Sequence, residues 1–418
     1  MIAPRFMQVL LTAILLAACT ISPSPNPHIA ARGAATDIVI LVSIDGFRPD
    51  YLDRGVTPTL SRLAAEGARA SMRPAFPSVT FPNHYALVTG RTPDHNGMVN
   101  NRMEDPQRPG VTFTIGDKLV SADPVWWDDA TPIWATAQKQ GVMVGTMFWP
   151  GSDFQLKDGR PSLWRAFDQT LPGFARVDNL LAWLDLPAAQ RPALFTLYFD
   201  LVDTAGHRYG PDSADLNSAA AEVDAAMTRL MEGLRVRGLD RKTNLIVVAD
   251  HGMTEVSADR IIELDAAVTP LLARVVWDGA FAGIAPLAGR EAEAERALLG
   301  RKDHGECWRK GEIPARFGYG THRRVPAIIC LADVGWFYRS SQLTQYSEVP
   351  RGNHGYDPAA KEMAAIFIAH GPAIRRGVVL PDFPSVSVYE LVAKLAGVTP
   401  EPNDGSADDT RAALAGGR

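Results

Sequence analysis

Apolar runs that alternate with helical patterns make up the chain from about residue 37 to residue 400. The run at 38–44 is almost continuously apolar, as expected of a buried strand. Similar runs lie at 142–148, 193–199, 245–249 and 364–369. Strands without polar alternation are buried on both faces. The pattern therefore predicts an α/β fold with a mainly parallel central sheet and helices on both faces.

Helical segments separate these runs. Thr57-Pro58 and Thr131-Pro132 each indicate a helix start, because threonine caps helices and proline is tolerated in the first turn. Residues 213–234 carry the amphipathic pattern of a long helix. Two stretches break the alternation, at about 151–172 and 265–350, and we expect insertions there that wall the active site. This assigns 37–400 to one catalytic domain.

Both ends of the chain differ from this domain. The tail at 401–418 is rich in Gly, Ala and Asp and is expected to be flexible. Residues 1–18 combine Arg5 with an apolar run too short to span a bilayer, which predicts a signal peptide for export. Residues 19–36 contain alternating prolines and small residues and read as a flexible tether.

The end of the signal, Leu16-Ala17-Ala18-Cys19, resembles the lipobox of bacterial lipoproteins. The resemblance implies cleavage before Cys19, lipidation of Cys19 and attachment to a membrane. By similarity to Gram-negative lipoproteins, Thr20 after the cysteine favours the outer membrane, with the enzyme in the periplasm. The alternative is a plain signal peptide with an incidental cysteine.

The remaining cysteines, Cys307 and Cys330, would meet oxidising conditions in an exported protein, so we expect a disulfide between them. Two buried free thiols are the alternative. The 418 residues are 46% hydrophobic and 21% charged, with a net charge of −5. That balance is ordinary for a soluble protein and argues against a nucleic-acid polymer as partner. It leaves a small phosphorylated substrate open.

Acidic and imidazole side chains follow several predicted strands, where ligands gather in α/β sheets. They are Asp45, Asp203 with His207, Asp250 with His251, and, late in the chain, His354. One Asp-His-Gly after a strand is more often a turn or a cap, but so many such motifs suit two metal ions. Asp and His without Cys favour zinc.

A candidate nucleophile lies in the small-residue turn before residues 85–89. Thr80 would stand at a helix N-terminus, where backbone N–H groups favour phosphate. Metal coordination can ionise its hydroxyl without a separate base. Spacing alone does not exclude Ser78 as the nucleophile. The simplest alternative is that Thr80 only caps the helix.

These motifs resemble the nucleotide pyrophosphatase/phosphodiesterase family of the alkaline phosphatase superfamily over about 38–397. The matching strings are Asp45-Gly46-Phe47-Arg48, Thr80-Phe81-Pro82-Asn83-His84-Tyr85, Phe148-Trp149-Pro150-Gly151, Asp203-x-x-Gly206-His207, Asp250-His251-Gly252-Met253 and Gly352-Asn353-His354-Gly355-Tyr356-Asp357. The resemblance implies an alkaline-phosphatase-like fold and two Zn²⁺ per chain. It also implies hydrolysis of nucleotide phosphodiester or pyrophosphate bonds to nucleoside 5′-monophosphates through a covalent intermediate on Thr80.

The resemblance also implies the role of each residue. One zinc would be held by Asp45, Asp250 and His251 and would activate Thr80. The other would be held by the set Asp203, His207 and His354.

Further positions bear on the substrate. Asn101 matches an asparagine that binds a phosphate oxygen, and its lack of charge suits a phosphodiester. Phe81, Trp164 and Tyr198 match aromatics that stack on a nucleotide base, although ordinary core packing is the alternative for all of them. A choline- or lipid-phosphodiesterase and a phosphomonoesterase remain open on the same scaffold. The Cys/Ser-x-Pro-x-Arg context of sulfatases is absent around Thr80, and a non-catalytic metal-binding lipoprotein is disfavoured because ligands and nucleophile are all present.

Overall fold

The computed structural model describes residues 37–343 and 349–416. The predicted signal peptide, Cys19 and the tether up to residue 36 lie outside the described residues. Within the described ranges, no helix is both long and apolar enough to cross a membrane. What is described is the predicted catalytic domain and most of the C-terminal tail.

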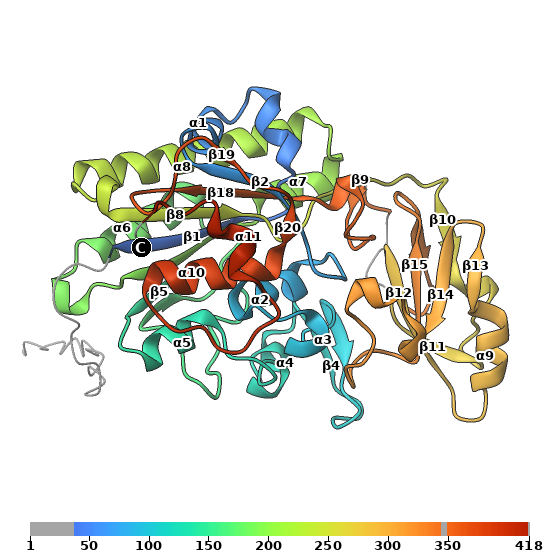
Figure 1. Cartoon of the computed structure of the whole chain (residues 1–418). Helices are drawn as coiled ribbons and strands as arrows, with labels where there is room; N and C mark the ends of the chain where they lie inside the picture. Colours follow the sequence, from blue (N-terminus) through green and yellow to red (C-terminus); the bar gives the residue numbers. More distant parts are fainter. Residues whose placement is uncertain (1–36, 344–348, 417–418) are drawn as a thin grey trace, which may run out of the picture.

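A nine-stranded sheet forms the centre of the molecule (Figure 1). Its strands are β1 (Ile38–Ile44), β2 (Ala68–Arg73), β5 (Val144–Met147), β6 (Leu163–Arg165), β7 (Leu194–Phe199), β8 (Thr243–Val248), β18 (Ala365–His370), β19 (Val378–Val379) and β20 (Phe383–Pro384). The order is β19-β2-β18-β8-β1-β7-β5-β6, with β20 beside β2. The inner strands β8, β1, β7 and β5 are parallel, and every residue of β1, β7 and β8 is buried, as their apolar runs predict.

The expected strand at 364–369 is present as β18, but it runs antiparallel to both β8 and β2. The sheet is therefore mainly parallel rather than wholly so. A strand that is buried on both faces has the same apolar run whichever way it points, and so its direction is not encoded in that pattern.

Helices cover both faces of the sheet (Figure 1). One face carries α1 (Pro58–Glu66), α6 (Gly173–Leu184) and α8 (Ala214–Val236), which contact one another through α8. The other face carries α2 (Thr80–Thr89), α5 (Ile133–Lys139) and α10 (Val388–Ala396). The long helix begins as predicted, because the side chain of Ser213 accepts a hydrogen bond from the N–H of Leu216.

The two Thr-Pro helix starts differ in detail from the expectation. The side chain of Thr57 makes no capping bond to α1. Instead the buried carboxylate of Asp224, on α8, accepts from the N–H groups of Thr59 (3.0 Å) and Leu60 (2.7 Å). In α5 the cap position is taken by Pro132 itself, one residue later than predicted. A cap supplied by a distant helix leaves no local signal in the sequence.

The two expected insertions have different structures. The stretch at 151–172 contributes β6, which extends the central sheet parallel to β5, so part of it belongs to the core fold. The stretch at 265–350 builds a separate five-stranded sheet at the right of Figure 1. We call it the cap. Its strands, in the order β11-β12-β15-β14-β13, are β11 (Ala273–Trp277), β12 (Phe281–Pro286), β13 (Gly300–Lys302), β14 (Gly305–Arg309) and β15 (Ile328–Ala332).

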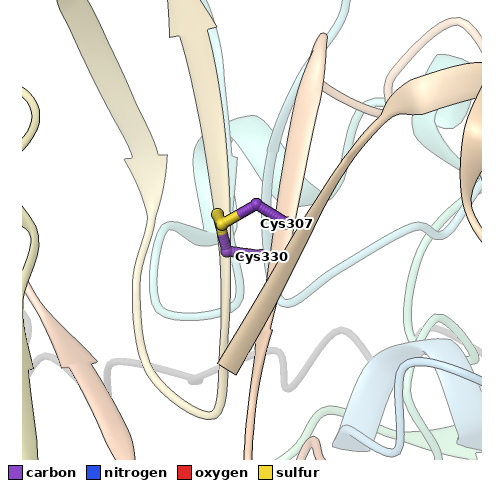
Figure 2. Close-up of a disulfide and its surroundings, with 2 residues drawn as sticks. All are labelled: Cys307 and Cys330. Carbon is purple, nitrogen blue, oxygen red and sulfur yellow. A yellow bond between two sulfur atoms is a disulfide. The ribbon is translucent and has the colours of Figure 1, made fainter. Parts of the chain in front are cut away.

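A disulfide joins Cys307 and Cys330, which confirms the predicted bridge (Figure 2). The two residues lie opposite each other on the antiparallel strands β14 and β15 of the cap. Both side chains are buried in the cap's own hydrophobic cluster. The bridge therefore stabilises the cap and is separate from the catalytic core.

The described part of the C-terminal tail, residues 401–416, packs on the core, which differs from the expectation of a flexible segment. It forms a short helix, α11 (Ala407–Arg411), capped by the side chain of Ser406. Thr410 and Ala413 are buried, and Leu414 pairs with Ile374 of the core. Small residues suited to a loop are equally suited to close packing, so composition alone misled the prediction.

Candidate active site

The predicted metal ligands lie at the carboxyl ends of strands, as expected. Asp45 follows β1, and Asp250 with His251 follows β8. Asp203 and His207 are on α7 (Leu201–Tyr209), directly after β7. His354 follows β17 (Gly352–Asn353), a short strand paired with β9 (Thr254–Glu255). Segments from four parts of the chain thus converge at one edge of the sheet.

The ligand atoms form overlapping groups. Asp203, His207 and His354 form one group whose ligand atoms all lie within 4.8 Å of one another, and Asp45, Asp203 and His251 form another. The Nε2 atom of His251 is 3.0 Å from Asp250 Oδ2 and 3.5 Å from Asp45 Oδ1. These six residues, which we call the ligand cluster, are therefore brought together as the sequence predicted.

Three carboxylate oxygens in the ligand cluster are buried without a hydrogen-bond partner: Asp45 Oδ1, Asp203 Oδ1 and Asp250 Oδ2. A buried, unpaired carboxylate oxygen is costly, and proteins rarely keep one without a function. Three that converge with imidazole nitrogens form a donor set that suits divalent cations, zinc in particular. The residues present therefore fit two metal ions.

The histidine tautomers support the same interpretation. The Nδ1 atoms of His207, His251 and His354 lie 2.8–2.9 Å from the backbone oxygens of Gly352, Gly252 and Ser78, respectively. A carbonyl oxygen only accepts, so Nδ1 must carry the proton in each ring. Every Nε2 then presents its lone pair to the ligand cluster, which is the usual arrangement for a metal-ligating histidine.

Burial and neighbouring charges shift pKa values within the ligand cluster in opposing directions. Burial alone would lower the pKa of His251, but the charge of Asp250, together with the hydrogen bond to it and further neighbours, outweighs burial and raises that pKa. Burial raises the pKa of Asp45 well above its ordinary value, and the charge of Asp250 adds to the effect. Burial lowers the pKa of His354, and the neighbouring His251 acts in the same direction. A bound cation favours the ionised carboxylates and the neutral imidazoles that this site needs.

The hydroxyls of Thr80 and Ser78 have different surroundings. Thr80 is the first residue of α2, and its Oγ1 is 3.3 Å from Nε2 of His251. Its side chain does not cap the helix, since the cap position is Val79. Ser78 is fully buried and its hydroxyl donates to the backbone oxygen of Tyr356 at 2.7 Å. Of these two hydroxyls, only that of Thr80 faces the ligand cluster.

The side chain of Asn101 is held at the start of α2 by a hydrogen bond from the main chain. Its Oδ1 accepts from the N–H of Phe81 at 2.9 Å. That bond assigns the amide orientation and leaves the NH₂ group of Asn101 as a donor beside the start of α2. The arrangement suits a phosphate oxygen, which accepts hydrogen bonds.

The predicted aromatic residues fall into two kinds. Phe81 is half-buried, and Trp164, on β6, is 37% exposed with the guanidinium of Arg160 4.6 Å above its ring. Both therefore keep surface for a ligand. Tyr198 differs from its predicted role as a stacking residue. It is buried, and its hydroxyl donates to Asp45 Oδ2 at 2.6 Å, which leaves only Oδ1 of that carboxylate unpartnered.

His84 is a site residue that the sequence reasoning missed. Its Nδ1 donates to the backbone oxygen of Thr80 at 2.9 Å and lies 3.3 Å from Asp250 Oδ2, while its Nε2 accepts from the hydroxyl of Ser43 at 2.9 Å. Although it is close enough to group with Asp45 and Asp250, both ring nitrogens are already used. It positions Thr80 and Asp250. The sequence feature that could have indicated this role is the position of His84, a histidine among the buried residues of α2.

The fold and this site define a hydrolase built around a candidate two-metal centre. The family model described as "Type I phosphodiesterase / nucleotide pyrophosphatase" matches residues 39–357, and the chain belongs to this family. An uncharacterized pyrophosphatase/phosphodiesterase of Schizosaccharomyces pombe is 35% identical over 382 residues, 88% of this chain and 78% of the relative. The bis(5′-adenosyl)-triphosphatase of Xenopus laevis is 34% identical, covering 98% of this chain and 88% of its own length.

Solved structures agree with the family assignment. Murine ectonucleotide pyrophosphatase/phosphodiesterase 5 has a TM-score of 0.86 and 34% identity, covering 90% of this chain and all of that chain. An inactive threonine-to-alanine variant of the same mouse protein, in complex with AMP, also has a TM-score of 0.86. Rat ectonucleotide pyrophosphatase/phosphodiesterase family member 3 is a longer relative, of which the chain spans 45%.

Proposed function

We propose that this enzyme uses two Zn²⁺ and Thr80 to hydrolyse nucleotide phosphodiester and pyrophosphate bonds, releasing nucleoside 5′-monophosphates. One observation carries the proposal: unpartnered carboxylate oxygens and histidine Nε2 atoms converge beside the hydroxyl of Thr80. Neutral protein groups alone do not satisfy such a cluster, whereas cations do.

The proposed division of ligands follows the family resemblance and is compatible with the distances. His251, 3.3 Å from the hydroxyl of Thr80, would hold one zinc together with its neighbours Asp45 and Asp250, and the group of Asp203, His207 and His354 would hold the other. Asp203 also groups with Asp45 and His251, so it lies between the two sets. When bound, the metals supply a lowered pKa for a coordinated hydroxyl or water and neutralise charge on the phosphate.

The protein's own groups position the reacting atoms. Thr80 Oγ attacks phosphorus, a new O–P bond forms, and the bond to the leaving oxygen breaks, which leaves a nucleotidylated threonine. Water then breaks the Thr80–phosphorus bond and restores the hydroxyl as the nucleoside 5′-monophosphate departs. The N-terminus of α2 and the NH₂ of Asn101 stabilise negative charge on the phosphate oxygens. His84 holds the backbone of Thr80 in place throughout.

The substrate class rests on two further features. Asn101 adds no positive charge, which suits a diester with one negative charge rather than a monoester with two. Phe81 and Trp164 keep exposed aromatic surface on which a base can stack. Two relatives point the same way, since one is called a bis(5′-adenosyl)-triphosphatase and another binds AMP in its inactive form.

Two substitutions test the nucleophile. Thr80→Ala should lower turnover of the p-nitrophenyl ester of thymidine 5′-monophosphate by roughly three orders of magnitude or more while zinc stays bound. Ser78→Ala is the matched control and should retain most activity, because its hydroxyl faces away from the ligand cluster. Undiminished activity of Thr80→Ala would overturn the proposal.

A substrate panel tests the diester preference. Bis(p-nitrophenyl) phosphate and p-nitrophenyl phosphate differ in charge but share a leaving group. We expect the diester to be the better substrate. A clear preference for the monoester would refute the role given to Asn101 and support a phosphomonoesterase.

We also propose that the enzyme is exported and anchored by lipidated Cys19 to the outer membrane. The sequence pattern of residues 1–36 supports this, and the disulfide Cys307–Cys330 suits an oxidising compartment. Metabolic labelling with a radioactive fatty acid should label the wild-type chain and not a Cys19→Ala variant. Equal labelling of both, or of neither, would contradict the proposal.

A further inference from the structure

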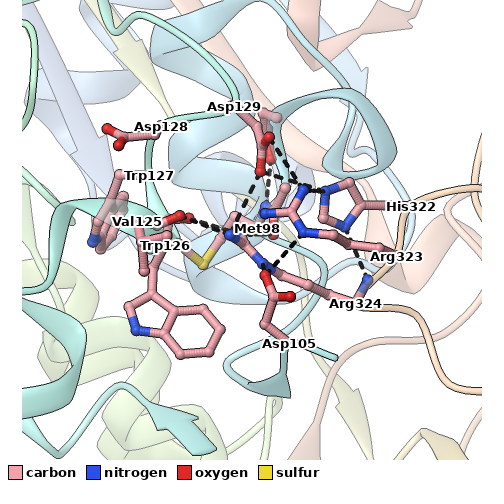
Figure 3. Close-up of polar contacts among 12 residues, drawn as sticks. Met98, Asp105, Val125, Trp126, Trp127, Asp128, Asp129, His322, Arg323 and Arg324 are labelled. Carbon is pink, nitrogen blue, oxygen red and sulfur yellow. Dashed lines mark hydrogen bonds and ion pairs between the residues drawn. The ribbon is translucent and has the colours of Figure 1, made fainter. Parts of the chain in front are cut away.

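A buried arginine of the cap, Arg324, contacts residues of the catalytic core (Figure 3). Arg324 precedes β15, and its side chain is completely buried. A buried guanidinium is strongly destabilising unless its donors are satisfied. The partners of Arg324 therefore show which parts of the structure it organises.

Four hydrogen bonds satisfy the guanidinium. Nε donates to Asp105 Oδ2 at 2.8 Å, and Nη1 donates to the backbone oxygens of Gly97 (2.8 Å) and Trp126 (3.0 Å). Nη2 donates to the backbone oxygen of Val125 at 2.7 Å. Three of the four acceptors are main-chain oxygens, so Arg324 fixes backbone positions and not only charge.

The charge of Arg324 is balanced within a small network. Asp105, almost completely buried, also accepts from Nε of Arg323 at 3.0 Å. Asp129 lies 3.5 Å from Arg324 and also within 3.4 Å of both Arg323 and His322. Arg324 further lies over the ring of Trp126, 5.0 Å from its centre. The network joins the cap to two core loops.

These two loops contain or adjoin residues proposed to bind the substrate. Gly97 and Asp105 flank the stretch that contains Asn101. The segment held through Val125 and Trp126 continues directly into Trp127, whose ring lies 5.9 Å from that of Phe81.

Trp127 is tightly enclosed. A Cβ placed on Gly151 would come within 2.6 Å of its ring, so Trp127 has no room to shift on that side. Phe113, on β4 (Thr112–Thr114), contacts the rings of Phe81, Trp126 and Trp127. A change in the main chain at Trp126 would therefore be passed through packed rings to Phe81.

We propose that Arg324 is a positioning residue for recognition of the nucleotide base: it sets the place of Trp127, which in turn supports the ring of Phe81. The proposal rests on the proposed function, in which Phe81 stacks on the base. It gives the cap a part in substrate selection without any contact between the cap's arginine and the substrate.

Arg324→Lys tests this with two substrates. Lysine keeps the charge but has too few donors in the right geometry to hold four acceptors. For the p-nitrophenyl ester of thymidine 5′-monophosphate we expect KM to rise about tenfold, because small displacements at a binding wall are costly. For bis(p-nitrophenyl) phosphate, which has no base, kcat and KM should stay within about twofold, because the side chain of Asn101 keeps its own hydrogen bond to the N–H of Phe81. Arg323→Gln is the matched control, because the guanidinium of Arg323 contacts the side chains of Asp105, Asp129 and His322 rather than main-chain oxygens.

Trp127→Leu gives an independent check that does not disturb the ion network. It should reproduce the loss for the nucleotide ester, and the double variant with Arg324→Lys should lose little more, since both act through Phe81. Equal losses for both esters, or additive losses in the double variant, would overturn the proposal. A failure of the proposed function would be seen separately, as a wild-type enzyme with no preference for the nucleotide ester.

Discussion

The ligand cluster and the network around Arg324 are both buried and charged, but their polar groups have different surroundings. In the ligand cluster, carboxylate oxygens of Asp45, Asp203 and Asp250 have no hydrogen-bond partner. In the network around Arg324, every nitrogen of the guanidinium donates to an acceptor. Asp129 Oδ2 in this network also has no hydrogen bond, but it lies 3.5 Å from the positively charged guanidinium of Arg324. Burial and charge are common to both, so neither alone marks a functional site. The difference is that Asp129 Oδ2 lies beside a guanidinium that balances its charge, whereas the unpartnered oxygens of the ligand cluster converge with imidazole nitrogens, an arrangement that suits a cation from outside the protein.

The largest expected effect is on activity, in the ligand cluster. Asp203→Asn removes one ligand charge from the compact metal group, and we expect activity to fall about a thousandfold, equivalent to about 4 kcal/mol of transition-state stabilisation. With metals removed by chelation, the free energy of unfolding should not fall, because Asp203 Oδ1 has no protein partner to lose. Assays of turnover and chemical unfolding of the metal-free protein measure the two effects. A loss of stability with unchanged turnover would reverse the assignment of this region.

In the Arg324 network, by contrast, a substitution should lower the free energy of unfolding. Asp105→Ala leaves Arg324 buried without its carboxylate, and breaking such a pair costs about 3–5 kcal/mol of unfolding free energy. Urea unfolding of the wild type and the variant gives this difference directly. Asp178→Ala is a suitable control, because its pair with Arg229 is exposed and should contribute less than about 1 kcal/mol. Similar losses in both variants would show that burial of the network is not the cause.

A smaller effect is expected where a neutral group supports a metal ligand. Tyr198→Phe removes the hydrogen bond to Asp45 while keeping the ring that packs against His84 and Phe167. Metal affinity should fall about tenfold, as is typical when a partner of a metal ligand is lost. Competition with a chelator of known affinity measures this. An unchanged affinity would return Tyr198 to the base-stacking role expected from the sequence.

The smallest effect is on the pH dependence of stability. Burial opposes ionisation of Asp105, but its hydrogen bond to Arg324 and further bonds hold its pKa below the ordinary value of 3.8. As the pH falls, the carboxylate of Asp105 is therefore protonated in the unfolded chain before it is protonated in the folded protein. The stabilisation from Asp105 is complete above about pH 4 and is lost as pH falls through the lower folded-state pKa.

Thermal unfolding of the metal-free protein checks this. The stability difference between wild type and Asp105→Asn should shrink as pH falls below about 4. Work on the metal-free form excludes metal loss as the cause. A difference that stays constant down to pH 2.5 would show that Asp105 is not ionised in the fold.

Much of the fold was predictable, for local reasons. The continuous apolar run of β1 and the capped amphipathic pattern of α8 are encoded in adjacent residues, and both were predicted correctly. The direction of β18, the cap of α1 by Asp224 and the packing of the tail depend on distant partners, and the sequence pattern does not show them. These three features result from tertiary contacts.

The candidate site divides in the same way. The ligand cluster could be predicted from the sequence, because aspartate and histidine residues follow the predicted strands. The distinction between Thr80 and Ser78 required knowing which hydroxyl faces the cluster. The roles of His84 and Tyr198 required their hydrogen bonds, because a buried aromatic or imidazole ring has the same sequence signature whether it packs, stacks or positions a ligand.

The most direct test of the account is a metal titration. The purified, metal-free enzyme is supplied with increasing zinc, and bound metal and turnover of the nucleotide ester are measured in the same samples. Activity should rise until two zinc ions are bound per chain and then remain constant, and Asp203→Asn should bind one fewer. Full activity with one zinc or none would contradict a two-metal centre at Thr80.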